Sequence, residues 1–208
     1  MSQTKLKVIA YSDYICPFCY IGYHRIEKLK KEYNLTVEWR PFEIHPETPA
    51  WGVLKEDLAA HKGYLEGLRT HIKRLADEDG LTLKFSEFLP NSRLALFISE
   101  YARKEGKFEE FHKLVLEAYW FEGKDIGSID LLLDLAESIG LDKNEIDHYL
   151  HTNEPFEILQ KSLNEIRKMG INGVPAFIIG NRLIFGAQPY DVFKKVINII
   201  LDEESKKN

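Results

Sequence analysis

Cysteine and long hydrophobic runs are both scarce in this sequence. Only two cysteines occur among the 208 residues, at positions 16 and 19. No apolar run approaches the roughly 20 residues that a membrane-spanning helix needs. Residues 1–5 lead into the first predicted strand without an apolar signal region. We therefore expect no membrane association and a cytoplasmic location.

An excess of positive charge is also missing. The chain has 28 Lys and Arg against 33 Asp and Glu, which gives a formal net charge of -5. Proteins whose main partner is a nucleic acid or an anionic membrane surface usually carry a basic patch, so the charge argues against both partners. The length is sufficient to bury a substantial core, in one domain or two small ones.

The two cysteines form a Cys-x-x-Cys pair. In a reducing compartment such a pair is more often catalytic, redox-sensing or metal-binding than a structural disulfide. A structural zinc site would need four ligands, whereas no third cysteine exists and the seven histidines show no His-x-x-x-His spacing. Zinc is therefore the minor alternative, and we expect no metal.

The pair lies between a predicted strand and a predicted helix. Residues 6–11 alternate in hydrophobicity, as a sheet strand does, and residues 35–40 alternate again. Between them, residues 17–33 favour a helix that stops near Asn34. Two strands joined by such a helix form a right-handed βαβ unit with parallel strands.

The middle of the chain is predicted to be helical almost throughout. Periodicity and capping residues indicate helices over 55–78, 91–105, 107–122, 129–139, 142–151 and 155–170. After Gly170, short strands at 176–179 and 182–185 are joined by a hairpin at Gly180-Asn181, and a helix follows over 190–202. We predict an α/β fold: a four-stranded mixed sheet from residues 1–53 and 171–208, interrupted by a helical insertion over 54–170.

Three motifs give the sequence a family resemblance. They are Ser-Asp-x-x-Cys-Pro-x-Cys-Tyr-Ile-Gly at 12–22, Gly-Val-Pro-Ala-Phe at 173–177 and Gly-Ala-Gln-Pro at 186–189. With the position of the helical insertion, they make the chain similar to the DsbA-type branch of the thioredoxin superfamily, and within it to the FrnE-like group. The resemblance implies a thioredoxin-like fold. Related kappa-class glutathione transferases and hydroxychromene-carboxylate isomerases usually have serine where this chain has Cys16.

The placement of the cysteines predicts their roles. A sulfur at a helix N-terminus faces unpaired N–H groups and the positive end of the helix dipole, which favour thiolate. We therefore expect Cys16 to be the more exposed sulfur and the nucleophile. Cys19, one turn deeper, would resolve the mixed disulfide. Pro17 favours the start of the helix.

The resemblance extends the site to the other end of the chain. It implies that Pro175 follows a cis peptide bond and packs against the cysteine pair. The backbone of Val174 would then hold an extended substrate by strand-like hydrogen bonds. Together with Pro17 and Phe18, these residues form the predicted substrate-binding set.

Phe18 departs from the oxidising members of the family. DsbA itself has histidine just before the second cysteine, where it helps to stabilise the thiolate. Phe18 offers neither a hydrogen bond nor a charge at this position. We therefore expect a site that is less oxidising than DsbA, with a direction of exchange that depends on the surrounding thiols.

Three residues are candidates for a glutathione or small-molecule cleft. Asn91 and Arg93 match a family region that can face the cleft, and Gln188 could bind a carboxylate of glutathione at a helix terminus. A helix cap, a solvated charge and loop structure explain these residues equally well. No cofactor is expected, apart from glutathione as a co-substrate.

These observations predict a thiol–disulfide oxidoreductase that acts on protein or small-molecule thiols and disulfides, as a monomer or a homodimer. The alternative is a glutathione-dependent isomerase or transferase with a small organic substrate, which would not need Cys19. A third interpretation is a chaperone-like binding protein that uses the apolar surface of the insertion.

Overall fold

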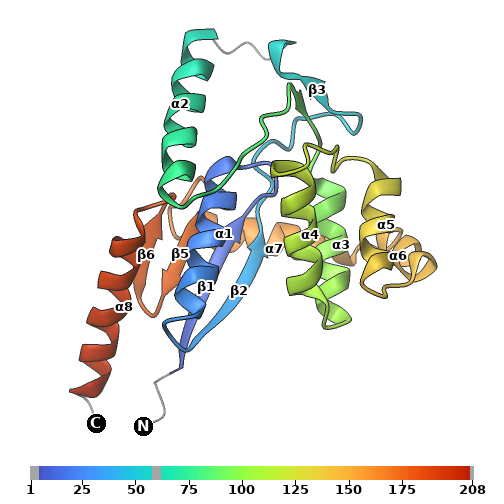
Figure 1. Cartoon of the computed structure of the whole chain (residues 1–208). Helices are drawn as coiled ribbons and strands as arrows, with labels where there is room; N and C mark the ends of the chain where they lie inside the picture. Colours follow the sequence, from blue (N-terminus) through green and yellow to red (C-terminus); the bar gives the residue numbers. More distant parts are fainter. Residues whose placement is uncertain (1–4, 58–61, 207–208) are drawn as a thin grey trace.

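A four-stranded mixed sheet forms the base of the molecule. The computed structural model describes residues 5–57 and 62–206 (Figure 1). The sheet has the order β2-β1-β5-β6, with β1 (Leu6–Ser12), β2 (Leu35–Pro41), β5 (Ala176–Ile179) and β6 (Arg182–Phe185). β1 and β2 are parallel, whereas β5 is antiparallel to both β1 and β6. The predicted fold class is confirmed.

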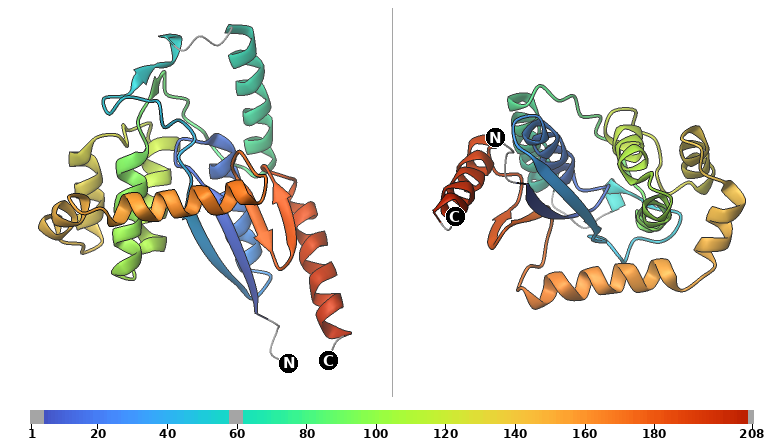
Figure 2. Two further views of the ribbon diagram at one scale, coloured as in Figure 1. Left: turned by 180° about the vertical axis from the view of Figure 1, so that it is seen from behind. Right: turned by 90° about the horizontal axis from the view of Figure 1, so that it is seen from below.

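Helices cover both faces of this sheet. α1 (Pro17–Lys30) connects β1 to β2, and α8 (Tyr190–Ser205) follows β6. Their apolar side chains, such as Ile26 and Phe193, pack on Val8, Ala10 and Phe177 in one buried cluster. α7 (Glu154–Lys168) crosses the opposite face (Figure 2). The alternation of β1 therefore reflects burial on two faces, with Val8 and Ala10 on the side of α1.

Four other helices of the predicted insertion lie beyond the β2 edge of the sheet (Figures 1 and 2). They are α3 (Arg93–Lys104), α4 (Phe108–Trp120), α5 (Ile129–Ser138) and α6 (Lys143–Leu150). Two predicted caps are confirmed: Ser128 accepts a hydrogen bond from Leu131 N, and Asp142 accepts them from the amides of Asn144 and Glu145. No helix in the described residues is long and apolar enough to cross a bilayer.

Helix is not as continuous over 54–92 as predicted. β3 (Val53–Leu54) pairs antiparallel with β4 (Phe88–Leu89), and a short helical turn, η1, spans Lys55–Asp57. α2 (Lys62–Glu78) follows, and predicted helical positions 58–61 lie outside the described residues. Gly80 has a positive φ of 67° just after α2, a backbone conformation that ends the helix. Residues between α2 and β4 are irregular rather than helical.

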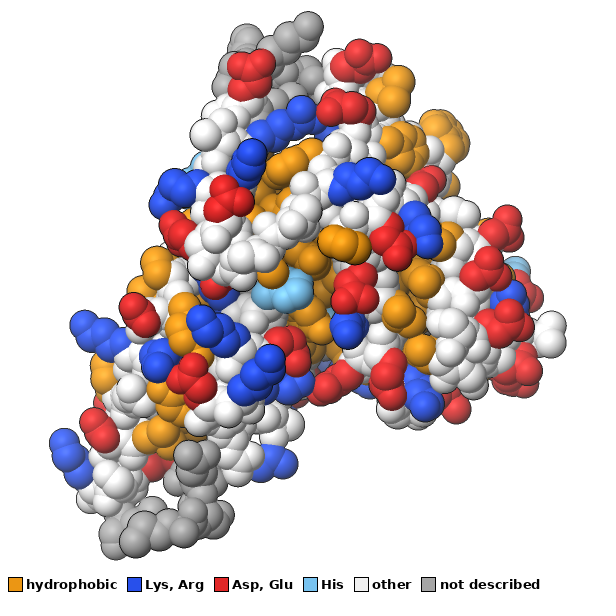
Figure 3. Space-filling view, in the orientation of Figure 1, with side chains coloured by type: hydrophobic (Ala, Val, Ile, Leu, Met, Phe, Trp, Pro, Cys, Tyr) orange, Lys and Arg blue, Asp and Glu red, His pale blue; other side chains and the backbone are white. Residues whose placement is uncertain are grey.

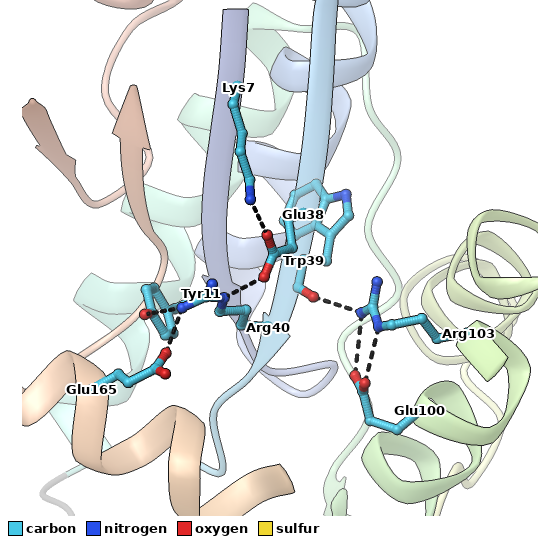
Figure 4. Close-up of polar contacts among 8 residues, drawn as sticks. All are labelled: Lys7, Tyr11, Glu38, Trp39, Arg40, Glu100, Arg103 and Glu165. Atoms are coloured by element: carbon cyan, nitrogen blue, oxygen red, sulfur yellow. Dashed lines mark hydrogen bonds and ion pairs between the residues drawn. The ribbon is translucent and has the colours of Figure 1, made fainter. Parts of the chain in front are cut away.

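Two arginines tie the helices of the insertion to the sheet (Figure 4). Arg40, on β2, hydrogen-bonds to the hydroxyl of Tyr11 and forms an ion pair with Glu165 of α7. Arg103, on α3, donates to the carbonyl oxygen of Trp39 at 2.6 Å. Because these contacts join α3 and α7 directly to β1 and β2, the insertion and the sheet share one packed interior.

A buried arginine anchors α2. The side chain of Arg25, on α1, is only 1% exposed, and its Nε lies 2.6 Å from Oδ2 of Asp79. Its Nη1 donates to the carbonyl oxygens of both Ala187, at 2.8 Å, and Gln188, at 2.6 Å. The C-terminal end of α2 is therefore held against α1 and against the segment that precedes α8.

Candidate functional site

The chain leaves β1 at Ser12 and enters α1 through the turn that carries Cys16. Cys16 occupies the N-cap position with extended backbone angles (φ -85°, ψ 116°), and Pro17 is the first helical residue. The side chain of Cys16 makes no capping hydrogen bond. Its sulfur is thus left at the positive end of the helix dipole, where a negative charge is favoured.

The second half of the site comes from residues just before β5. The peptide bond between Val174 and Pro175 is cis. The thiol of Cys16 donates to the carbonyl oxygen of Val174, with a sulfur–oxygen distance of 3.6 Å. The carbonyl oxygen of Val174 therefore accepts a hydrogen bond from the protonated thiol. A substrate that donates a hydrogen bond to this oxygen would replace the thiol as donor.

Gly22 allows α1 to approach this segment. A Cβ atom built on Gly22 would lie 2.7 Å from the ring of Phe177 and 3.6 Å from Cγ of Pro175. The first distance is shorter than real Cβ contacts, so any larger residue would push the helix or the ring away. The glycine that closes the cysteine motif thus sets the distance between the two halves of the site.

Both cysteines are buried free thiols. Cys16 is 3% exposed and Cys19 is fully buried. Cys16 is therefore the more exposed of the two cysteines, as predicted, but the two exposed fractions differ little. Burial raises the pKa of Cys19, and the hydrogen bond to Cys16 and the charge of Cys16 raise it further. The Asp13 amide and the Ser12 hydroxyl oppose this rise. Cys19 therefore holds its proton more tightly than an exposed cysteine.

Asp13 fixes the turn before Cys16 from inside. Its carboxylate is fully buried and accepts hydrogen bonds from the amides of Ile44, at 2.7 Å, and Ile15, at 3.3 Å. Burial raises the pKa of Asp13 to about 6, although its hydrogen bonds from the amides of Ile44 and Ile15 act in the opposite direction. The turn thus depends on a buried carboxyl group that can change its charge near neutral pH.

Tyr14 ties the same turn to α3 and α4. Trp120 Nε1 donates to the carbonyl oxygen of Tyr14 at 2.7 Å, and the Tyr14 hydroxyl hydrogen-bonds to Ser99 and to Nδ1 of His112. The Ser99 hydroxyl donates its proton to Ala95 O, so Tyr14 donates to Ser99 and His112 donates to Tyr14. Burial lowers the pKa of His112 to about 3, which keeps the ring neutral.

Phe18 lies under α2. It is half-buried, and its ring centre is 6.0 Å from that of His71 on α2. It also packs against an apolar cluster formed by Ile21, Ile72, Leu75 and Ala76. The residue that distinguishes this chain from oxidising family members therefore serves as a packing surface for α2.

A cleft of about 440 Å³ opens beside the active-site turn. Ile15 and Pro17, on either side of Cys16, form part of its wall. The opposite wall is largely apolar and includes Leu68, Ile72, Phe85 and Trp120. Figure 3 shows hydrophobic side chains gathered between α2 and the β3 segment, with Lys and Arg side chains beside them. Lys55 and Arg69 also line this cleft.

The three residues proposed for a glutathione cleft make contacts within the fold. Asn91 donates a hydrogen bond to Thr48 O at 2.6 Å and accepts one from the amide of Arg93. The first residue of α3 is Arg93, two positions after the predicted start at Asn91. Arg93 forms an ion pair with Glu43, and Gln188 donates to Phe185 O at 2.9 Å. None of the three lines the 440 Å³ cleft. Contact with glutathione remains a prediction.

Several residues of the site carry no assigned role in the sequence prediction. Asp13 belongs to the quoted motif, and its position three residues before Cys16 was the available signal. Tyr14, His112, Lys55 and Arg69 gave no signal, because their importance depends on how α2 and α4 pack. Among the residues that the structure describes, no group of three or more His, Cys, Asp or Glu side chains could hold a metal ion.

The chain belongs to the family of DSBA-like thioredoxin domains, whose model matches residues 7–198. It is 34% identical over 201 residues to the uncharacterised protein YwbO of Bacillus subtilis (strain 168), covering 95% of this chain and 96% of that one. It is 26% identical over 178 residues to a 2-hydroxychromene-2-carboxylate isomerase of Pseudomonas putida, covering 85% and 86%.

Solved structures show the same fold. A probable DsbA oxidoreductase from Streptomyces coelicolor superposes with a TM-score of 0.78 at 22% identity, covering 92% of this chain and 88% of that one. A 2-hydroxychromene-2-carboxylate isomerase superposes with a TM-score of 0.81 at 23% identity, covering 97% of this chain and 99% of that one. The cytosolic disulfide reductase DsbM from Pseudomonas aeruginosa, with GSH, superposes with a TM-score of 0.64 at 18% identity, covering 92% of this chain and 98% of that one.

Proposed function

We propose that this protein is a thiol–disulfide oxidoreductase in which Cys16 attacks a substrate disulfide and Cys19 resolves the product. The observation that carries the proposal is the position of Cys16, at the start of α1 and 3.6 Å from the carbonyl oxygen that precedes cis-Pro175. Membership of the family of DSBA-like thioredoxin domains supports the same chemistry.

The environments of the two thiols suit a division of roles. Cys16 stands at a helix N-terminus, where thiolate is favoured. Cys19 lies fully buried beside it, and burial raises its pKa, so it keeps its proton while Cys16 attacks. In the mixed disulfide, Cys19 then displaces the substrate thiol and forms a disulfide with Cys16.

The test is the rate of disulfide exchange by the wild type and by the Cys16→Ser and Cys19→Ser variants. Insulin reduction and the oxidation of a dithiol peptide cover the two directions. We expect Cys16→Ser to abolish both reactions and Cys19→Ser to stop turnover after one adduct. Equal rates for all three proteins would contradict the proposal.

A second candidate is a glutathione-dependent isomerase that acts on a small organic substrate. The observation in its favour is the 26% identity to the Pseudomonas putida isomerase over most of both chains. Such an enzyme would use bound glutathione and would not need the thiol of Cys19. Isomerisation that is unchanged in Cys19→Ser would support this candidate, whereas loss of activity would support disulfide exchange.

We also propose a cytoplasmic location and glutathione as a co-substrate. The cytosolic reductase DsbM, whose structure includes GSH, shares the fold and supports both proposals. Fractionation of cells that express the full chain tests the location, and calorimetric titration with glutathione tests the binding.

A further inference from the structure

The route to Cys16 is narrow. A disulfide that reacts with a thiolate must bring one sulfur into contact with it, in line with the sulfur–sulfur bond. Only 3% of Cys16 is exposed, and Cys19 behind it is not exposed at all. A disulfide on the surface of a folded protein could not reach this sulfur without moving the surrounding chain. A small molecule needs only the cleft.

The cleft beside α2 lies next to Cys16. Its 440 Å³ would accommodate a small molecule, and the two residues on either side of Cys16, Ile15 and Pro17, line it. We propose that the disulfide reduced at Cys16 belongs to a small molecule with a flat apolar body and an anionic group, which enters through this cleft. The inference rests on the proposed exchange by Cys16 and Cys19, and it names the substrate class.

The apolar side chains that line the cleft favour a substrate with a flat apolar body. Leu68 and Ile72 project from α2, and the rings of Phe85 and Trp120 meet edge to face at 6.4 Å. An aromatic ring placed among these side chains would leave water and contact two further rings, both of which favour binding. A polar peptide packed against these four apolar side chains would lose its hydration without gaining hydrogen bonds from them.

The ammonium of Lys55 favours a substrate that carries an anionic group. Its ammonium is half-buried and donates to Ser86 O at 2.8 Å, but within the described residues it forms no ion pair. Burial lowers the pKa of Lys55, and the charge of Arg69 lowers it further while Glu87 opposes this. Arg69, by contrast, is paired with Glu87 at 2.7 Å. A ligand carboxylate beside Lys55 would therefore pair with a cation that forms no ion pair with the side chains that the structure describes.

The acidic residues of the cleft do not cancel this preference. Glu56, Glu66 and Glu87 also line it, but all three are exposed, and the Glu87 side chain is 74% exposed. Water screens carboxylates at such positions, whereas the half-buried Lys55 is screened less. The cleft is thus most favourable to negative charge near Lys55.

The reaction balances with one external reductant. The Cys16 thiolate attacks one sulfur of the substrate, whose sulfur–sulfur bond breaks and releases the first thiolate. Cys19 then attacks the Cys16 sulfur, releases the second thiolate and leaves a Cys16–Cys19 disulfide. The substrate gains two electrons, and the two released thiolates take up protons, one of them from Cys19. A dithiol, oxidised in turn, returns the protein to its reduced form.

The experiment compares three disulfides in single-turnover reactions with the fully reduced protein. Dithiobis(nitrobenzoate) is aromatic and anionic, dithiodipyridine is aromatic and neutral, and insulin represents a protein disulfide. Each rate constant is divided by that of the same disulfide with dithiothreitol, which removes differences in intrinsic reactivity. We expect the ratio to be highest for dithiobis(nitrobenzoate) and lowest for insulin.

Variants of the cleft separate its two features. Lys55→Met should lower the ratio for dithiobis(nitrobenzoate) roughly tenfold and leave that for dithiodipyridine unchanged, since one charged contact is lost. Lys55→Arg should restore it, and Lys73→Met, an exposed change on α2, is the matched control. Leu68→Trp, which fills the cleft from a half-buried position, should slow both aromatic disulfides but not insulin.

The two levels of the proposal can fail separately. If insulin has the highest ratio and neither Lys55→Met nor Leu68→Trp changes the aromatic disulfides, the small-molecule inference is overturned while disulfide exchange stands. If Cys16→Ser reacts with every disulfide as fast as the wild type, the proposed exchange itself is overturned.

Discussion

The thiol of Cys16 lies 3.6 Å from the carbonyl oxygen of Val174, a residue 158 positions away in the sequence. The register of the sheet produces this contact. β5 pairs antiparallel with β1 so that Ala176 lies opposite Tyr11. Residues 174 and 175 therefore lie beside the end of β1, where the turn to Cys16 begins. The site depends on this pairing as much as on the cysteines.

Replacing Phe18 by histidine should make the protein more oxidising. A histidine at this position can donate a hydrogen bond to the Cys16 sulfur or carry a positive charge near it, and both stabilise the reduced form. We expect the reduction potential to rise by tens of millivolts, where about 30 mV corresponds to 1.4 kcal/mol. Equilibration with glutathione buffers measures it. Phe18→Leu should stay near the wild type, and a lower potential for Phe18→His would contradict the argument.

Replacing Gly22 by alanine should destabilise the protein by about 1–3 kcal/mol, the usual cost of overpacking. The added methyl group would come within 2.7 Å of the Phe177 ring, which is fully buried. Denaturant unfolding gives the change in free energy. Gly67→Ala is the control, because a Cβ there meets nothing within 4 Å. A similar effect of both substitutions would argue against close packing at Gly22.

Asp13 should make stability fall as pH rises through the acidic range. Burial raises the pKa of Asp13 from 3.8 to about 6. Between these values the folded state keeps a proton that the unfolded state has lost, so the stability contributed below pH 4 is lost as pH rises to about 6. The full effect is about 3 kcal/mol.

Asp13→Asn, whose side chain does not titrate, isolates this term. The difference between the unfolding free energies of the two proteins, measured by denaturation from pH 4 to 7, should change with pH. The wild type should lose stability relative to the variant as pH increases. A constant difference across this range would show that the carboxyl group does not change its charge there.

Replacing Arg25 by methionine should cost about 3–5 kcal/mol, as is typical when one partner of a buried ion pair is removed. Asp79, whose side chain is 11% exposed, would be left without its cation, and two carbonyl groups would lose their donor. Arg74→Met is the control: Arg74 is 62% exposed in its pair with Glu78, and exposed pairs contribute about 0–1 kcal/mol. Chemical denaturation compares the two, and equal losses would refute the anchoring role of Arg25.

Local patterns were sufficient to predict most of the fold. The alternation of residues 6–11, the Gly180-Asn181 turn and the Asp142 cap each act over a few residues, and the structure has all three. The β3–β4 pair was missed because two-residue strands leave no periodicity.

The surroundings of the cysteines were harder to predict. His112 and Lys55 are polar residues whose burial follows from the packing of α2 and α4, and the residues next to them in the sequence do not indicate this burial. Phe18 was interpreted as the absence of a histidine and as a substrate-binding residue. Its contact with His71 could not be foreseen, because it requires the position of α2 over the site.

The central claim is that Cys16 is the nucleophile and Cys19 the resolving thiol, and trapping the mixed disulfide tests it most directly. The Cys19→Ser protein is mixed with dithiobis(nitrobenzoate), and the product is analysed by intact and peptide mass spectrometry. We predict one stable adduct on Cys16, whereas the wild type should form a Cys16–Cys19 disulfide and Cys16→Ser should remain unmodified. Adduct formation on Cys19 of the Cys16→Ser protein, at the rate seen for Cys16, would contradict the account.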